Sequence, residues 1–149
     1  LSLRLQQADA VSRFIPEAHV YHKRRATLKQ FRRQVFRFGA ARPLLAKAHP
    51  GNLKLTHLFP LVFTLYRYLT AIFAVLGIFY FHNSLFAMPF APYVFYMFAV
   101  FLTALRHEGL AVALRVVQTT NTMNEGYGIG FLRNFIEVYL KGNPKGIKL

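Results

Sequence analysis

The sequence contains no cysteine, which excludes disulfides, thiolate metal sites and cysteine nucleophiles from this chain. Acidic residues are nearly as scarce, with five in 149 residues against 19 lysines and arginines. No two of the five lie close together in the sequence: Asp9, Glu17, Glu108, Glu125 and Glu137. A pair of carboxylates is therefore not expected to act as general acid and base here, and no serine-nucleophile motif replaces it. We expect no complete active site in these 149 residues.

Charge is also missing from residues 68–105, which contain no Lys, Arg, Asp or Glu. Twelve of the 19 basic residues lie in residues 1–54, so the apolar and basic parts of the chain are segregated. Two apolar segments, 58–81 and 86–105, are each long enough to cross about 30 Å of hydrocarbon as a helix. The pattern predicts a mainly α-helical membrane protein with a two-helix transmembrane hairpin at 53–107, rather than a soluble domain.

The short turn at 82–85 predicts that the two helices are antiparallel neighbours. Basic residues flank the hairpin at both outer ends and are absent from the turn, so the positive-inside rule places both termini in the cytoplasm. Arg67 interrupts the first segment, and a charge near mid-bilayer costs at least about 2.5 kcal/mol. We expect Arg67 to snorkel to lipid phosphates, with 58–65 along the interface. An arginine facing a polar passage is the alternative.

The segment before the hairpin combines a predicted strand with a basic helix. Residues 13–22 predict a short strand that ends in β-forming residues. Thr27 is predicted to cap a helix that runs to Ala48, with an apolar face and basic residues around the rest, as is typical of a helix at a membrane surface. We expect Gly39 and Pro43 to break or bend this helix.

The segment after the hairpin, 108–149, predicts amphipathic helices and a basic tail. A short helix is expected at 108–121, followed by the small-residue stretch 126–130 and a further helical segment. Gly126 and Gly130 form a G-x-x-x-G pattern, which permits close approach of two helices.

Two histidines and the basic stretch 21–42 have competing interpretations. His19 and His22 are three residues apart, which on a strand places them on opposite faces. A two-histidine metal site is therefore not expected, although one of them could be a single ligand or form an ordinary hydrogen bond. The composition of 21–42 also suits nucleic acid, but the neighbouring apolar segments favour membrane lipids, a nucleotide diphosphate or a lipid-linked phosphate instead. We expect no nucleic-acid partner.

The order of motifs LSLRLQQA, RFIPEAHVYHKRR and FRRQVFRFGAARPLL, followed by a proline-containing turn and the hairpin, resembles the C-terminal part of bacterial family 2 glycosyltransferases of the GT-A type. The resemblance covers most of the chain and is best at residues 1–50. In that family a strand carries Pro, Ala, Val and His, and a helix carries a Gln-x-x-Arg-Trp motif. The matching residues here are Pro16, Ala18, Val20 and His22, then Gln34 and Arg37, with Phe38 in place of Trp.

The resemblance implies that residues 1–52 end the cytoplasmic domain of a membrane-anchored inverting glycosyltransferase of the bacterial inner membrane. Such an enzyme transfers a sugar from a nucleotide-sugar donor to a cell-envelope glycan or a lipid-linked acceptor, with Mg or Mn as the divalent cation. The nucleotide-binding fold, the metal-binding Asp-x-Asp and the catalytic base would precede this sequence. We therefore expect the chain to be a piece of a longer protein and inactive by itself.

The same resemblance implies roles for five residues. Arg37 would contact the diphosphate, Gln34 an acceptor hydroxyl or the diphosphate, and Phe38 the acceptor sugar. His22 would contact the metal or the diphosphate, with Arg25 in support. The alternative function is a non-enzymatic membrane anchor or complex subunit that binds anionic lipid through its basic helix.

Overall fold

The computed structural model describes residues 5, 8–9, 11, 13–21, 27–51, 53–143 and 145. These residues are mainly helical, in agreement with the predicted fold class. Short turns of 3-10 helix precede α3 and join α3 to α4, and a π-helical turn extends α5. In chain order the elements are α2 (Leu28–Ala48), η1 (Leu55–His57), α3 (Phe59–Phe81), η2 (Ser84–Phe90), α4 (Ala91–Glu108), α5 (Leu110–Phe135) and η3 (Ile136–Leu140).

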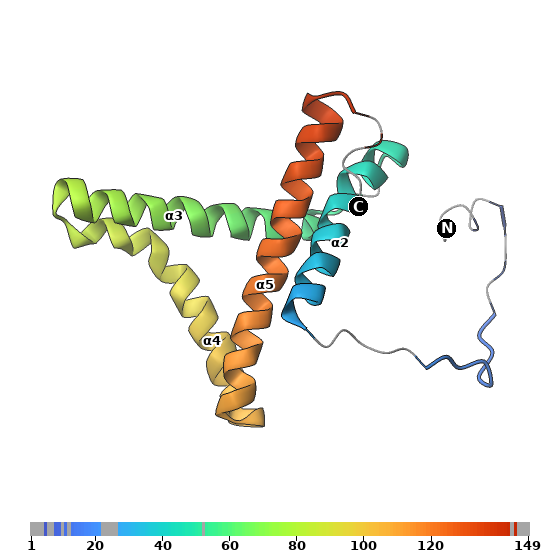
Figure 1. Ribbon diagram of the computed structural model, residues 1–149, viewed down its shortest axis with the longest axis horizontal. Helices are drawn as coiled ribbons and strands as arrows, with labels where there is room; N and C mark the ends of the chain where they lie inside the picture. The colour runs from blue at the N-terminus through green and yellow to red at the C-terminus, as the bar shows by residue number, and fades with distance from the viewer. Residues whose placement is uncertain are drawn as a thin grey trace.

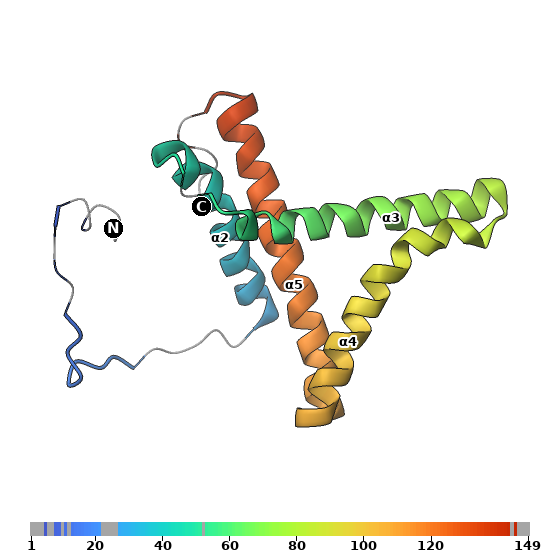
Figure 2. The same cartoon turned by 180° about the vertical axis from the view of Figure 1, so that it is seen from behind.

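Helices α2 and α5 lie side by side, and α3 lies across α5 and extends away from it (Figure 1). Helix α4 returns obliquely from the far end of α3 to the start of α5, as the reverse view also shows (Figure 2). The predicted hairpin therefore exists, but its two segments are antiparallel neighbours only near the turn. There η2 packs closely against α3, and the first residues of α4 contact it through the rings of Tyr93 and Tyr96 against Phe63, whereas the rest of α4 packs against α5. Pro89 within η2 explains part of this difference, because a proline removes a backbone donor and favours a change of direction.

The start of α2 agrees with its predicted cap. The hydroxyl of Thr27 accepts a hydrogen bond from the backbone N–H of Gln30 at 3.2 Å. The helix then continues past Gly39 and through Pro43 to Ala48, so these residues do not break it, and the alternative of a bend stays a prediction. Both residues lie on the buried face of α2, where tertiary packing outweighs their low helix propensity.

The small-residue stretch of α5 is also helical, so the helix expected at 108–121 is longer than predicted and continues to Phe135. Gly126 and Gly130 face α2, and Gly128 faces α3. A Cβ atom added at Gly126 would lie 2.7 Å from a methyl of Val35, and one added at Gly130 would overlap the backbone carbonyl of Phe36. The predicted close approach of two helices is confirmed, and it keeps the glycine-rich segment helical because each missing side chain leaves room for a neighbour.

Helices α2 and α5 run in the same direction. Arg32 lies beside Gly126, Phe36 beside Gly130, and the amide of Asn134 donates to the carbonyl of Ala40. Contacts thus advance toward the C-terminal end of both helices together. The face of α2 that carries Val35, Gly39, Ala40 and Pro43 is therefore the face held against α5.

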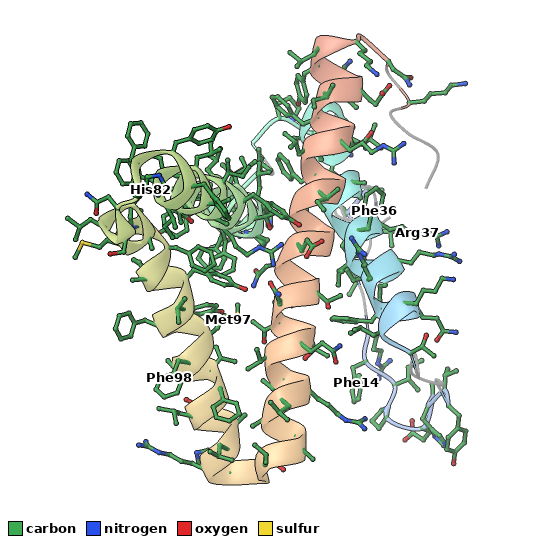
Figure 3. The ribbon with its side chains drawn as sticks, turned by 60° about the vertical axis from the view of Figure 1, so that its left-hand side comes forward. Phe14, Phe36, Arg37, His82, Met97 and Phe98 are labelled. Atoms are coloured by element: carbon green, nitrogen blue, oxygen red, sulfur yellow. The ribbon has the colours of Figure 1, made fainter. Side chains whose placement is uncertain are left out.

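Two segments, α3 and Ser84–Glu108, are long and apolar enough to cross a membrane by length and composition. Only 11% and 6% of their most apolar windows are buried within the chain, so they are not core helices of this molecule. Figure 3 shows that side chains of α4 point in two directions. Met97 points toward α5, whereas Phe98 points away from it and is 53% exposed. Exposed apolar surface of this extent requires an apolar environment, so both segments are candidate membrane spans.

The strand predicted at 13–22 is not found in its described part. Residues 13–21 contain a turn at Pro16 and Glu17, and their hydrogen bonds are local, as from Ala18 to Ile15. A strand needs a neighbouring strand to pair its backbone N–H and C=O groups. No segment among the described residues provides one.

Candidate functional site

The predicted site residues on α2 share the side of the helix that is turned away from α5. Gln34 and Arg37 are one helical turn apart, and Phe38 lies next to them. Arg37 and Phe38 are exposed, and Gln34 is half-buried. Figure 3 shows Arg37 pointing away from α5. We call Gln34, Arg37 and Phe38 the outer α2 face.

The polar groups of the outer α2 face are available to a ligand. No hydrogen bond or ion pair joins Gln34 or Arg37 to another residue of the described part of the chain. A guanidinium offers five N–H donors in a plane, which suits the oxygens of a phosphate, and a glutamine amide can both donate to and accept from a hydroxyl. The arrangement can therefore bind a charged ligand, although it holds no group suited to activating a nucleophile.

Two further predicted site residues, His22 and Arg25, lie outside the described residues. Within the described part of the chain, no group of three or more His, Asp or Glu side chains could hold a metal ion. A metal site at His22 accordingly stays a prediction.

A polar cluster that was not predicted joins the four helices. Glu125 of α5 forms ion pairs with Arg32 of α2 at 3.2 Å and with Arg67 of α3 at 3.0 Å. Arg67 also donates to the side-chain oxygen of Asn121 at 2.5 Å, and the hydroxyl of Tyr93 in α4 lies 3.3 Å from the same oxygen. We call these five residues the interhelical cluster. It contains two guanidinium groups and one carboxylate.

The position of Arg67 corrects the prediction that this residue snorkels to lipid phosphates. Its side chain is only 13% exposed, and its guanidinium lies 4.4 Å from the centre of the Tyr68 ring. Because α5 supplies Glu125 and Asn121 as partners, the charge is compensated between the helices. Helix α3 runs without a break from Phe59 through Arg67. One arginine in an apolar segment and one acid in a later helix could have suggested this pair, but sequence spacing gives no indication that they meet.

A second basic region lies where α2 ends and α3 begins. The pKa of His57 is lowered by its partial burial and by the positive charges of Arg42 and Lys54, and its Nδ1 accepts from the backbone N–H of Lys54 at 3.1 Å. Burial raises the pKa of Tyr127, and the nearby positive charge of Arg42 opposes this shift. At neutral pH both rings are therefore uncharged.

No protein-family model, curated protein or solved structure matches the chain.

Proposed function

We propose that this chain is the membrane-attached C-terminal part of an inverting glycosyltransferase of the bacterial inner membrane. It would help to transfer a sugar from a nucleotide-sugar donor to a cell-envelope glycan or a lipid-linked acceptor. One observation carries the proposal: Gln34 and Arg37 lie together without a hydrogen bond or ion pair to any other described residue, on a helix whose opposite side is held by close backbone contact with α5. A helix restrained in this way positions its outer side chains, and accurate positioning is a large part of catalysis.

The residues of the outer α2 face have distinct roles in this proposal. Arg37 binds the oxygens of the donor diphosphate, where a guanidinium can form two parallel hydrogen bonds. Gln34 holds an acceptor hydroxyl or the diphosphate, and Phe38 packs against the acceptor sugar. His22 and Arg25 would add further contacts to the diphosphate or its metal ion.

The reaction itself requires groups beyond these. A carboxylate base of a nucleotide-binding domain takes the proton of the acceptor hydroxyl, whose oxygen then attacks the anomeric carbon. The bond from that carbon to the diphosphate breaks with inversion, and the diphosphate leaves with its electron pair. Arg37 would stabilise the charge that develops on the leaving group, and a divalent cation, Mg or Mn, would supply further positive charge there when bound.

The membrane arrangement follows from the same proposal. Helices α3 and α4 cross the inner membrane, and both termini are cytoplasmic because the basic residues flank the outer ends of the hairpin. Since α3 lies across α5 (Figure 1), a spanning α3 keeps the α2–α5 pair near the membrane surface. This location suits a basic amphipathic helix and a transferase whose acceptor is attached to the membrane.

The test compares Gln34→Ala and Arg37→Ala with Arg33→Ala in the full-length protein. Arg33 is exposed and lies one helical turn before Arg37, but the sequence motif assigns it no role in binding. We expect sugar transfer to fall at least about 100-fold in the first two variants, as for the loss of one transition-state contact, and to change little in Arg33→Ala. Membrane insertion should be the same in all three. Full activity of both Gln34→Ala and Arg37→Ala would contradict the site assignment.

The basic surface of α2 favours a second candidate function, a non-enzymatic anchor that binds anionic lipid. Sequencing the coding region upstream distinguishes the two, since an open frame with an Asp-x-Asp motif supports the enzyme. The topology is tested separately with single cysteines, for which the cysteine-free chain gives a clean background. We expect a membrane-impermeant reagent to label Asn83→Cys from the periplasmic side and Ala48→Cys only from the cytoplasmic side.

A further inference from the structure

A small cavity lies between the first turns of α2 and the middle of α5. Its volume is about 260 Å³, and it is lined by Leu28, Lys29, Arg32, Thr122 and Glu125. We propose that this cavity, which we call the α2–α5 pocket, binds the phosphate group of an anionic membrane lipid. The proposal is independent of the glycosyltransferase assignment, because Arg32 faces α5 whereas Gln34 and Arg37 lie on the other side of α2.

The charges around the α2–α5 pocket favour an anion. Lys29 and Arg32 line the pocket, and Arg67 forms an ion pair with Glu125, which also lines it. Glu125 is the one acid of the lining, and its two oxygens are already paired with Arg32 and Arg67. Lys29, Arg32 and Arg67 carry three positive charges against the one negative charge of Glu125, so these residues have a net charge of +2.

The donors of the pocket are free to bind. Lys29 is exposed and forms no hydrogen bond or ion pair with another described residue. Arg32 uses one terminal nitrogen for Glu125, and its side chain remains 60% exposed. An ammonium and a guanidinium on adjacent turns of one helix can therefore contact the same phosphate group.

The surroundings favour a lipid over a free anion. Leu28 adds an apolar side chain to the lining, and Glu125 connects the pocket directly to α3, a candidate membrane span. The pocket thus adjoins the surface that needs an apolar environment, where a phosphate arrives with acyl chains attached. Basic pockets next to membrane helices are typical sites for anionic headgroups.

The experiment measures lipid retention by the purified intact protein in detergent, using native mass spectrometry with dioleoyl phosphatidic acid as the probe. Diacylglycerol, which lacks the phosphate, and inorganic phosphate are the parallel arms. The variants are Lys29→Gln and Arg32→Gln, and Arg33→Gln is the matched control that removes one positive charge from α2 outside the pocket. Because Lys29 is exposed and unpaired, Lys29→Gln should fold normally, which circular dichroism checks.

We expect phosphatidic acid to be retained about fivefold less by Lys29→Gln and less still by Lys29→Gln combined with Arg32→Gln. Arg33→Gln should resemble the wild type, and diacylglycerol should not be retained. Equal losses in Lys29→Gln and Arg33→Gln, or no loss in either, would overturn the proposal. Binding of inorganic phosphate without retention of the lipid would overturn the assignment to a lipid.

Discussion

The α2–α5 pair and the α3–α4 hairpin are stabilised in opposite ways. In the pair, glycines bring two backbones together, and a buried amide from Asn134 bonds to the carbonyl of Ala40. In the hairpin, large apolar side chains point outward, and little of either helix is covered by the rest of the chain. The α2–α5 pair is therefore stabilised by close packing between its two helices, whereas the hairpin needs an apolar environment.

The interhelical cluster lies where these two regions meet. Glu125 belongs to the pair, and Arg67 belongs to the hairpin. An ion pair at this junction is only partly hydrated, so the loss of one partner should lower the stability of the chain more than in an exposed pair. The contrast between close backbone packing and polar contacts leads to four predictions, ordered by expected effect.

Gly39→Ala should destabilise the chain most. The added methyl would overlap the backbone carbonyl of Tyr127, which cannot move without separating α2 from α5. We expect the free energy of unfolding in detergent to fall by about 3 kcal/mol, although alanine favours a helix. Gly77→Ala is the matched variant in the hairpin: its methyl would overlap Cβ and the ring of Phe86 in the short element η2, a side chain rather than a backbone, so we expect a smaller loss. A larger effect of Gly77→Ala would contradict the comparison.

Arg67→Gln and Arg32→Gln remove the two partners of the same carboxylate. Arg67 is 13% exposed and Arg32 is 60% exposed. We expect Arg67→Gln to lower the free energy of unfolding by about 2 kcal/mol, less than for a fully buried pair, and Arg32→Gln by less than about 1 kcal/mol. The effect of Arg32→Gln should shrink further in 1 M salt because of screening. Similar costs for both variants would show that exposure does not govern this cluster.

Thr64→Val tests a neutral contact at the same junction. Thr64 is 4% exposed, and its hydroxyl donates to the backbone carbonyl of Asn124 at 3.0 Å. Its loss should cost about 1 kcal/mol in thermal unfolding. Thr103→Val is the control, because that exposed hydroxyl bonds to Ala99 of its own helix, and it should have almost no effect.

Tyr127→Phe should stabilise the chain slightly, by about 1 kcal/mol or less, because the variant buries no unpaired hydroxyl. The sign of its pH dependence follows from the raised pKa of Tyr127. Above the ordinary pKa of 10.0, the unfolded chain loses this proton while the folded chain keeps it, so the wild type loses stability as the pH rises. The difference between variant and wild type should therefore grow above pH 10 in unfolding measurements. A constant difference would contradict the raised pKa.

Local features could be predicted from the sequence, and contacts between distant segments could not. The cap at Thr27 and the close approach at Gly126 and Gly130 are confirmed, because each depends on neighbouring residues. The strand expected at 13–22 is not found where the structure describes it, and α2 is not broken at Gly39 or Pro43, because pairing and packing partners decide such segments. For the candidate site, the sequence spacing predicts that Gln34 and Arg37 lie one helical turn apart. Only the tertiary structure shows that they lie on the side of α2 that is turned away from α5.

The sequence by itself determined that this chain has two apolar segments able to span a membrane and a basic helix before them, since length, hydropathy and charge are properties of composition. The tertiary structure decided that α2 runs parallel to α5, that α4 leaves α3 to join α5, and that Glu125 pairs with Arg67. These outcomes depend on which surfaces fit at close range. A glycine in the sequence indicates that another segment can approach closely, but only the folded structure shows which segment does.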